Sequence, residues 1–314
     1  MRAEPGDWIA VDWGTSRMRA ALVAADGEVR ERAEPGPGMG SLKPHEFEPA
    51  LLQAIHEWLG TEPMEVLVCG MAGARQGWRE APYVEVPASL TALLDGAVRV
   101  ETKDRRIRVR IVPGLCVRDP APDVMRGEET QLSGLLTTLG IADATVCLPG
   151  THAKWARIEN GRVVSFSTVM TGELHALLRE HSILRHSVGT LRGDAAMAPF
   201  DSAVRQAIAS KGAVLPLLFG IRAASLLNDE DPDRNASRLS GLLVGADVAT
   251  SLGAAAEVHL IGSSELTKLY ARAIHLAGAT AHIHDGNALA VAGFHAMRVW
   301  RRDAERGVRE WEGA

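Results

Sequence analysis

One short sequence pattern occurs twice in this chain, and this repeat limits the possible folds more than any other feature. The two copies are residues 9–23 and 145–158. In each copy an apolar strand leads into a Gly-Thr dipeptide, a second strand follows, and an Asx-Gly turn closes a further hairpin. Gly14 and Gly150 hold equivalent places, 136 positions apart. A chain that repeats one set of hairpin strands in both halves is expected to fold into two similar lobes.

The rest of the chain alternates strands with helices, which predicts an α/β protein. With 314 residues, the chain is long enough for two domains that each bury a core. We place the first lobe at residues 1–138 and the second at residues 139–314, where the last helix could also pack back on the first lobe. Helical spacing of apolar residues predicts the main helices at 45–59, 127–139, 173–184, 202–227 with an interruption at Pro216, 240–252 and 288–300.

Composition and charge exclude several classes of protein. The net charge of −5 gives no reason to expect nucleic acid or an anionic membrane as a partner. The basic stretch 103–110 alternates its charges with apolar residues, which favours a solvated edge strand. No segment reaches the roughly 18 uninterrupted apolar residues of a membrane span. Cys69, Cys116 and Cys147 lie far apart in apolar runs, so we expect buried free thiols and a cytoplasmic protein.

The first copy of the hairpin carries residues that can bind a phosphate chain. Gly14 permits a tight turn whose backbone amides, with the hydroxyls of Thr15 and Ser16, can point at phosphate oxygens. Asp12 ends the preceding strand and can bind Mg²⁺ directly or through water, and Arg19 completes the motif. A single hairpin of this kind could equally be a plain β-turn capped by an aspartate. The second copy makes the phosphate-binding interpretation the better one.

The second copy differs from the first in one place that matters for a metal. Leu148 stands in the place of the aspartate, so this hairpin is expected to bind phosphate through Gly150 and Thr151 without Mg²⁺. Lys154 could add to phosphate binding or could be a solvent-facing strand residue. His152, inside the same motif, has no partner at a metal-ligand spacing, which indicates a polar contact or a surface residue. Some ATPases hold the phosphates of a nucleotide between two such hairpins.

An acidic dipeptide lies between the two hairpins, in Gly127-Glu128-Glu129. Two acids in the first turn of a helix are favoured by the helix dipole, so this could be no more than a helix start. The same junction would face a cleft between two lobes, where a carboxylate can accept the proton of a substrate hydroxyl that attacks a γ-phosphate. One well-placed acid is sufficient, because positioning and charge stabilisation do most of the work in phosphoryl transfer.

Two glycine-containing turns follow predicted strands. Gly70 and Met71 end a buried strand, so the backbone there can approach a ligand closely. Gly262, Ser263 and Ser264 form a strand-to-helix turn, which is a weak nucleotide-loop signal and equally a tight turn without a ligand.

Taken together, these residues resemble the 2-dehydro-3-deoxygalactonokinase family of the actin/Hsp70/sugar-kinase superfamily. The resemblance covers nearly the whole chain, and its most specific strings are residues 124–132 and 168–175. The strings that carry it are AVDWGTS (10–16), GMAG (70–73), VPGLC (112–116), VMRGEETQL (124–132), PGTH (149–152) with the following KW (154–155), TVMTGELH (168–175) and SGLLVGA (240–246).

The resemblance implies a two-lobed actin-like ATPase fold of the ribonuclease H-like type, in which a βββαβα core is duplicated. It also implies ATP-dependent phosphorylation of 2-dehydro-3-deoxy-D-galactonate at its 6-hydroxyl in galactonate breakdown, with ATP and Mg²⁺ as cofactors. Residues 12–19 and 149–154 look like the two phosphate motifs, and residues 262–264 look like the adenosine-site loop. The Gly127-Glu128 step looks like the Gly-Asp at which related kinases carry their base, so we favour Glu128 over Glu129 as the base.

Substrate recognition stays open at this stage. A sugar-acid carboxylate needs a cation, and a bidentate arginine suits it best. Arg17, Arg75 and Arg126 are the candidates, and Gly70 and Met71 complete the expected substrate site. Two alternatives are a kinase of another small sugar acid or polyol on the same fold and a non-catalytic nucleotide-dependent sensor. The sequence also leaves the oligomeric state open, with a homodimer among the options.

Overall fold

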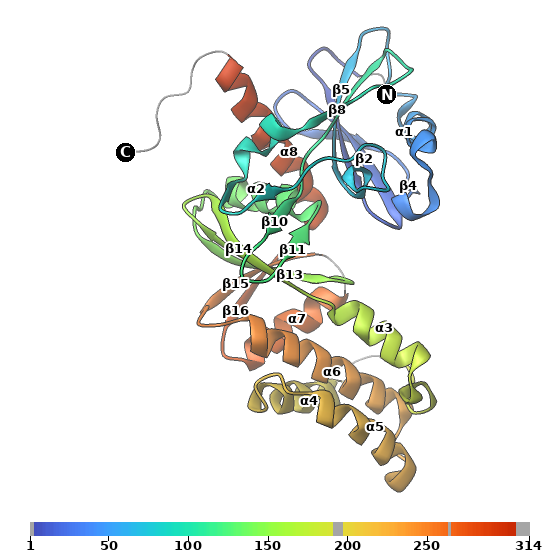
Figure 1. Ribbon diagram of the computed structural model, residues 1–314, viewed down its shortest axis with the longest axis vertical. Helices are drawn as coiled ribbons and strands as arrows, with labels where there is room; N and C mark the ends of the chain where they lie inside the picture. The colour runs from blue at the N-terminus through green and yellow to red at the C-terminus, as the bar shows by residue number, and fades with distance from the viewer. Residues whose placement is uncertain (1–2, 191–196, 263–264, 306–314) are drawn as a thin grey trace. The chain divides into compact units, whose positions relative to one another are not determined.

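The structure is a computed structural model that describes residues 3–190, 197–262 and 265–305 (Figure 1). The chain divides into two compact units. The first unit contains residues 1–143, 158–165 and 285–314, and the second contains residues 144–157 and 166–284. The second unit thus begins a few residues after the boundary that the sequence suggests at residue 138, and the last helix belongs to the first unit.

The first unit is built on a sheet with the strand order β3-β2-β1-β5-β9-β8. β1 pairs in antiparallel with β2 and in parallel with β5, so the carboxyl ends of β1 and β5 lie side by side. β9 is paired on both sides, by β5 and β8, so the edge strand predicted for residues 103–110 is wrong. The strands are β1 (Trp8–Trp13), β2 (Arg17–Val23), β3 (Val29–Arg32), β5 (Met64–Gly70), β8 (Val98–Val100) and β9 (Ile107–Ile111), with β4 (Gly36–Pro37) paired to β2.

The sheet that carries the second hairpin repeats this strand order. Its strands follow the order β14-β13-β12-β15-β16, which matches β3-β2-β1-β5-β9 strand for strand. β15 pairs in parallel with both β12 and β16. The two hairpin copies in the sequence therefore correspond to a duplicated α/β core, as predicted. The strands are β12 (Ala144–Leu148), β13 (Ala153–Glu159), β14 (Arg162–Val169), β15 (Glu257–Ile261) and β16 (Thr280–His284).

The helices follow the predicted pattern, and the largest difference is the start of α6. The helix predicted at 202–227 is interrupted as expected and forms α4 and α5, because Pro216 in the first turn of α5 cannot continue a preceding helix. α6 begins at Pro232 rather than near residue 240, because the Asp231 side chain caps it by accepting a hydrogen bond from Asp233 N. The main helices are α1 (Phe47–Ile55), α2 (Glu128–Leu139), α3 (Thr171–His181), α4 (Met197–Ala209), α5 (Leu215–Asn228), α6 (Pro232–Ser251), α7 (Glu265–Leu276) and α8 (Gly286–Glu305).

Shorter elements complete the described part of the chain. A small sheet of order β11-β10-β6 precedes α2. β11 is the last of its strands along the chain and leads into the acidic dipeptide. The short strands are β6 (Val84–Glu85), β7 (Ala88–Ser89), β10 (Leu115–Val117) and β11 (Asp123–Met125). The 3₁₀ turns are η1 (Met39–Ser41), η2 (Pro44–Glu46), η3 (Met71–Gly73), η4 (Thr91–Gly96) and η5 (Ile183–His186). None of the described helices is both long enough and apolar enough to cross a membrane.

The core of the first unit forms between its sheet and α1. Phe47 and Leu51 of α1 are fully buried in one cluster with Val11 of β1. The ring of Trp13, at the end of β1, lies 4.8 Å from that of Phe47 and 5.9 Å from that of Trp78 between centroids. Each such buried side chain contributes about 1.5–3 kcal/mol of hydrophobic free energy. This packing fixes the end of β1, where the first hairpin turn begins.

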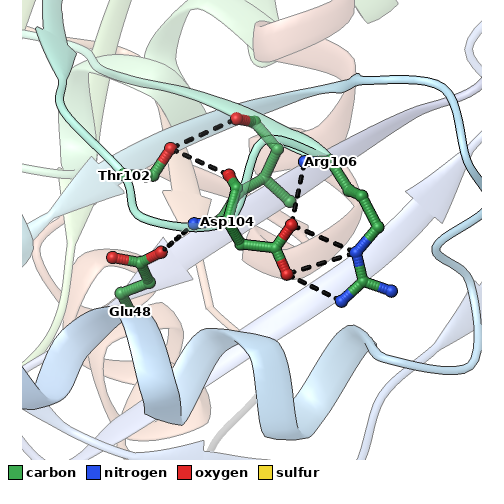
Figure 2. Close-up of polar contacts among 5 residues, drawn as sticks. Glu48, Thr102, Asp104 and Arg106 are labelled. Atoms are coloured by element: carbon green, nitrogen blue, oxygen red, sulfur yellow. Dashed lines mark hydrogen bonds and ion pairs between the residues drawn. The ribbon is translucent and has the colours of Figure 1, made fainter.

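A polar contact ties α1 to the connection between β8 and β9 (Figure 2). Glu48 of α1 accepts a hydrogen bond of 2.8 Å from the backbone N–H of Asp104, whose carboxylate accepts hydrogen bonds from the backbone N–H, Nε and Nη2 of Arg106. Thr102 Oγ1 donates to the carbonyl oxygens of Asp104 and Ile107. The hydrogen bonds from Arg106 lower the pKa of Asp104, so this carboxyl group stays ionised and holds the connection in place.

α2 and α8 pack with their backbones almost in contact (Figure 1). A Cβ atom at Gly134 of α2 would lie 1.9 Å from the carbonyl oxygen of Leu289, and one at Gly293 of α8 would lie 1.9 Å from that of Thr130. Side chains larger than a hydrogen atom therefore do not fit at either position. The two glycines hold α2, which begins at the acidic dipeptide, against the last helix.

Replacing Gly293 with alanine is expected to destabilise the first unit by about 2 kcal/mol, because the two helices must separate to admit the methyl group. This value is net of the gain in helix propensity, which is about 1 kcal/mol. Urea unfolding followed by tryptophan fluorescence measures the change. Gly60→Ala is the matched control, since a Cβ atom there meets nothing within 4 Å. Equal unfolding midpoints for the two variants would contradict the close helix packing.

Candidate active site

The first hairpin and a strand end meet at the carboxyl edge of the first sheet. In the parallel pairing of β1 with β5, Asp12 lies opposite Cys69 and Trp13 lies opposite Gly70. Gly70 has a φ of 85°, and a Cβ atom there would lie 2.7 Å from the carbonyl oxygen of Trp13. Only glycine tolerates this φ and this close contact, so no side chain covers the backbone at this position.

The hairpin turn exposes the groups expected to bind phosphate. The turn closes with a hydrogen bond of 2.9 Å from Gly14 N to the carbonyl oxygen of Arg17, and Thr15 and Ser16 are exposed. The segment 39–40 supports the turn. Its backbone N–H groups donate hydrogen bonds to the carbonyl oxygens of Gly14 and Thr15. This support was missed in the sequence, where the glycines at alternating positions 36, 38 and 40 are its only signal.

Asp12 combines partial burial with a nearby cation. Its carboxylate is 22% exposed and lies 3.5 Å from Arg19 Nη1, directly opposite on β2. Burial raises the pKa of Asp12, and the positive charge and hydrogen bond of Arg19 oppose that rise. Cys69 donates a weak S–H hydrogen bond of 4.0 Å to Asp12 Oδ1. The structure thus brings Asp12 and Arg19 together beside the hairpin turn.

The acidic dipeptide lies beside this strand end. Gly127, the residue before α2, has a φ of 105°, and a Cβ atom there would lie 3.2 Å from Gly70 Cα. Burial, followed by the negative charges of Asp12, Glu129 and Glu128, raises the pKa of the Cys69 thiol. Because all three carboxyl groups raise the pKa of this thiol, the thiol lies close to each of them. The end of β1, the end of β5 and the start of α2 therefore form one acidic cluster in the first unit.

The two glutamates of the dipeptide differ in their surroundings. Glu129 is fully buried and accepts hydrogen bonds from Gly127 N at 2.6 Å and Thr130 Oγ1 at 3.1 Å. Glu128 is half-buried, and its Oε2 accepts a hydrogen bond of 2.9 Å from Arg126 N. Burial and the neighbouring charge of Glu128 raise the pKa of Glu129 to about 8. At neutral pH Glu129 therefore carries a proton, and a protonated carboxyl group cannot act as a general base.

The raised pKa of Glu129 makes a prediction about stability. Its carboxyl group keeps its proton in the folded protein up to about pH 8 but loses it above about pH 4.5 in the unfolded chain. Its contribution to stability is therefore complete below pH 4.5 and is lost as the pH rises through 8. Glu129→Gln, which mimics the protonated group, should gain stability over the wild type by roughly 4 kcal/mol between pH 5 and pH 8.5. Urea unfolding at both pH values measures this, and parallel pH dependences in the two proteins would contradict it.

The candidate substrate residues differ in their burial and in their contacts. The Arg126 guanidinium stacks over the Tyr83 ring at 4.3 Å, and its Nη2 donates to the carbonyl oxygen of Ala81 at 2.7 Å. Its Nε and Nη1 are buried and have no hydrogen-bond acceptor among the described residues. Arg17 and Arg75 are exposed, on the hairpin turn and on the loop after η3 respectively. Met71 is half-buried directly after Gly70.

The second hairpin lies in the second unit and is held by the start of α3. Thr151 and His152 are exposed, and His152 Nε2 lies 2.5 Å from Glu173 Oε2. The backbone N–H of Glu173 donates to the carbonyl oxygen of Thr151 at 3.0 Å. Lys154 is buried and its Nζ donates to Thr168 Oγ1 of β14 at 2.7 Å, so the solvent-facing alternative for this lysine is wrong.

Gly262, one of the three residues predicted for the adenosine site, directly follows β15. Gly262 N donates to the carbonyl oxygen of His284 at 2.9 Å, which ties the turn to the end of β16. A Cβ atom at Gly262 would lie 2.5 Å from Thr267 Oγ1 of α7. Ser263 and Ser264, the other two residues predicted for the adenosine site, lie outside the described residues.

The acidic cluster of the first unit fits Mg²⁺ better than a transition metal. In the described ranges, no group of three or more histidine, cysteine, aspartate or glutamate side chains is arranged to hold a metal ion. Mg²⁺ does not need such a group, because one or two carboxylates, water and substrate phosphates complete its shell. Asp12, a partly exposed carboxylate beside the hairpin turn, supplies the oxygen donor that this ion prefers.

Comparison with known proteins gives consistent matches over most of the chain. Residues 12–297 match the model of a family described as 2-keto-3-deoxy-galactonokinase. The chain is 39% identical over 302 residues to "Probable 2-dehydro-3-deoxygalactonokinase DgoK1" of Rhizobium meliloti (strain 1021), covering 94% of this chain and 98% of that protein. It is 33% identical over 276 residues to 2-dehydro-3-deoxygalactonokinase of Escherichia coli (strain K12), covering 86% of this chain and 90% of that protein.

Solved structures agree with the fold. A crystal structure of a candidate 2-dehydro-3-deoxygalactonokinase from Sinorhizobium meliloti matches with a TM-score of 0.84 and 37% identity, over 98% of each chain. The activator of the 2-hydroxyisocaproyl-CoA dehydratase from Clostridium difficile, with bound ADPNP, matches with a TM-score of 0.51 at 12% identity, over 98% of this chain and 100% of that chain. This second likeness shows the fold alone, which is the α/β actin-like ATPase class that the sequence predicts.

Proposed function

The chain belongs to the 2-keto-3-deoxy-galactonokinase family, and we infer from this membership that it transfers the γ-phosphate of ATP to the 6-hydroxyl of 2-dehydro-3-deoxy-D-galactonate. The product is 2-dehydro-3-deoxy-6-phosphogalactonate, an intermediate of galactonate breakdown. The observation that carries the inference is the acidic cluster, where the half-buried Glu128 lies near Asp12 at the start of the first hairpin, in a chain of this family. A sensor without catalysis would have no need for that glutamate.

ATP is the phosphoryl donor in this proposal, and each unit contains one hairpin with groups that suit phosphate. In the first unit, the exposed hydroxyls of Thr15 and Ser16 and the Arg19 guanidinium bind phosphate oxygens. In the second unit, the exposed turn at Gly150 and Thr151 does the same, with His152 and Lys154 beside it. Gly262 and the two serines after it bind the adenosine part. Mg²⁺, held by Asp12, would neutralise charge on the phosphates.

Glu128 acts as the general base in this proposal. It accepts the proton of the substrate 6-hydroxyl while the oxygen forms a bond to the γ-phosphorus, the bond from that phosphorus to the β,γ-bridging oxygen breaks, and ADP leaves. The buried, protonated state of Glu129 supports this choice over its neighbour. Glu129 instead fixes the start of α2 through its hydrogen bond from Gly127 N.

Arg126 is our choice for the substrate carboxylate. Its Nε and Nη1 have no acceptor among the described protein atoms, and Tyr83 holds the guanidinium plane from one face. Each of these two N–H groups can donate a charge-assisted hydrogen bond to a carboxylate. Arg17 and Arg75, which are exposed, are the alternatives, and the Gly70-Met71 backbone supplies the adjoining wall of the site.

A cytoplasmic location follows from this proposal, because ATP is supplied there. The three cysteines are buried and unpaired, which fits the reducing conditions of that compartment.

One assay tests the proposed function. The purified protein is incubated with ATP, Mg²⁺ and, separately, 2-dehydro-3-deoxygalactonate, its gluconate-derived isomer, galactose and glycerol, and ADP release is measured. We expect the highest kcat/KM for 2-dehydro-3-deoxygalactonate. ADP release at the level of buffer with this compound, together with turnover of another acceptor, would assign the chain to a different sugar-acid or polyol kinase.

A further inference from the structure

A buried carboxylate in the second unit belongs to none of the predicted motifs. Asp247 lies on α6 and is 1% exposed. Its Oδ1 accepts hydrogen bonds from Trp155 Nε1 at 2.8 Å and from Ser251 Oγ at 3.4 Å. Its Oδ2 accepts from Thr171 Oγ1 at 2.6 Å and from the Tyr270 hydroxyl. Four side-chain donors on one buried carboxylate satisfy both of its oxygens, so the group is built into the fold.

Two of these donors lead to the second hairpin. Trp155 belongs to β13, the strand that leaves the hairpin turn. Thr171 is the first residue of α3, and the next two residues hold the turn itself. Gly172 packs so closely that a Cβ atom there would lie 2.5 Å from the carbonyl oxygen of Gly150, and Glu173 N donates to that of Thr151. Asp247 therefore anchors the hairpin from both of the elements that define its position.

A third donor leads to the turn after β15. Tyr270 is fully buried in α7, the helix that follows this turn. One turn earlier in α7, the buried Thr267 packs against Gly262. A Cβ atom at Gly262 would lie 2.5 Å from Thr267 Oγ1. The same Asp247 carboxylate thus holds α7, against which Gly262 packs.

Burial and charge explain why an acid is needed at this position. Burial raises the pKa of Asp247, while its hydrogen bonds from Thr171, Tyr270 and Trp155 oppose that rise. Burial and the nearby charge of Asp247 raise the pKa of Tyr270, so this hydroxyl keeps its proton and donates it. An asparagine would present an N–H₂ group to donors at one of the two oxygen positions and would leave at least one buried donor without an acceptor.

We propose that Asp247 is a positioning residue for ATP: it holds the second hairpin and Gly262 in one fixed geometry. The inference rests on the proposed function, since it assumes that both segments bind the nucleotide. Asp247 is buried and touches neither the substrate nor the reacting atoms, so it acts through Thr171, Trp155 and Tyr270. Its loss affects nucleotide binding, whereas the sugar-acid residues and the acidic cluster lie in the first unit.

The test uses Asp247→Asn in the full-length protein, with steady-state kinetics and direct ATP binding by calorimetry. We expect the KM for ATP and the Kd of ATP to rise about tenfold, because misplaced loops lose contacts with the nucleotide. The KM for the sugar acid should stay within about twofold of the wild type. Thr171→Val, which removes one donor, should shift the ATP constants in the same direction. Ser251→Ala is the matched control, because its contact is the longest of the four at 3.4 Å, and it should leave them unchanged.

The outcomes separate this inference from the proposed function. Failure of the wild type itself to bind ATP would overturn the proposed function and the inference with it. Wild-type binding together with unchanged ATP constants in Asp247→Asn would overturn the positioning role alone. Equal changes in both KM values would indicate a merely structural residue and would also overturn it. Thr171→Val and Tyr270→Phe carry the same comparison where Asp247→Asn does not fold.

Discussion

Glu128→Gln is expected to lower kcat by a factor of about 10² or more while ATP still binds, because glutamine cannot accept the proton of the attacking hydroxyl. The side chain keeps its size, and its amide oxygen can still accept the hydrogen bond from Arg126 N that Glu128 Oε2 accepts. The KM for ATP should therefore change little. Steady-state kinetics with saturating sugar acid measure kcat, and a fluorescent ATP analogue measures binding independently.

Glu129→Gln is the matched control for this substitution. Its carboxyl group is buried and protonated at neutral pH, so glutamine resembles the state that the wild type already has. We expect its kcat to stay within about tenfold of the wild-type value at pH 7. The reverse result, with near-normal turnover in Glu128→Gln and a large loss in Glu129→Gln, would move the base to Glu129.

Asp12→Asn is the second substitution with a large expected effect. The change removes the negative charge beside the first hairpin and leaves the Arg19 guanidinium, 3.5 Å away, without its ionic partner. We expect kcat/KM for ATP to fall by about 10²-fold and the Mg²⁺ concentration for half-maximal activity to rise, because the ion loses a carboxylate ligand. A titration of activity against Mg²⁺ at fixed ATP measures both quantities.

Asp26→Asn is the control for charge removal alone. Asp26 is an exposed acid at the turn after β2, where its carboxylate accepts a hydrogen bond from Glu28 N. This variant should keep the wild-type Mg²⁺ dependence. An Asp12→Asn protein with the same Mg²⁺ midpoint as Asp26→Asn would show that Asp12 does not serve the metal.

The duplicated core was predictable because it depends on local patterns. Apolar strands that run into Gly-Thr turns and close with Asx-Gly turns fix the first strands of each unit, and a strand order follows from their pairing. The start of α2 was also predictable, since an acidic dipeptide after Gly127 is both a helix start and a chemical signal. These features need only residues that are near one another in the sequence.

The features that were missed depend on contacts between distant residues. The basic stretch at 103–110 reads as an edge strand, yet β8 pairs on its outer side and makes β9 an interior strand. In the sequence Lys154 could equally be a solvent-facing residue. Only the fold brings its ammonium group within hydrogen-bonding distance of Thr168 on β14. Asp247 is 76 positions from Thr171 and 92 from Trp155, so no local pattern could connect them.

The difference between the two glutamates of the acidic dipeptide is a further example. In the sequence they are adjacent and equivalent, and the preference for Glu128 comes from a resemblance alone. Burial separates them in the structure, because helical geometry turns the side chain of Glu129 into the protein interior. The pKa of a side chain follows from its surroundings, which the sequence specifies only through the complete fold.

Phosphorus NMR of the reaction products tests the central claim most directly. The protein is incubated with ATP, Mg²⁺ and 2-dehydro-3-deoxygalactonate, and the sugar-acid product is observed without separation. We predict one new phosphomonoester signal, split by the hydrogens on carbon 6, that grows in step with ADP. Absence of a phosphomonoester, or a signal coupled to a hydrogen on another carbon, would contradict 6-phosphorylation by this protein.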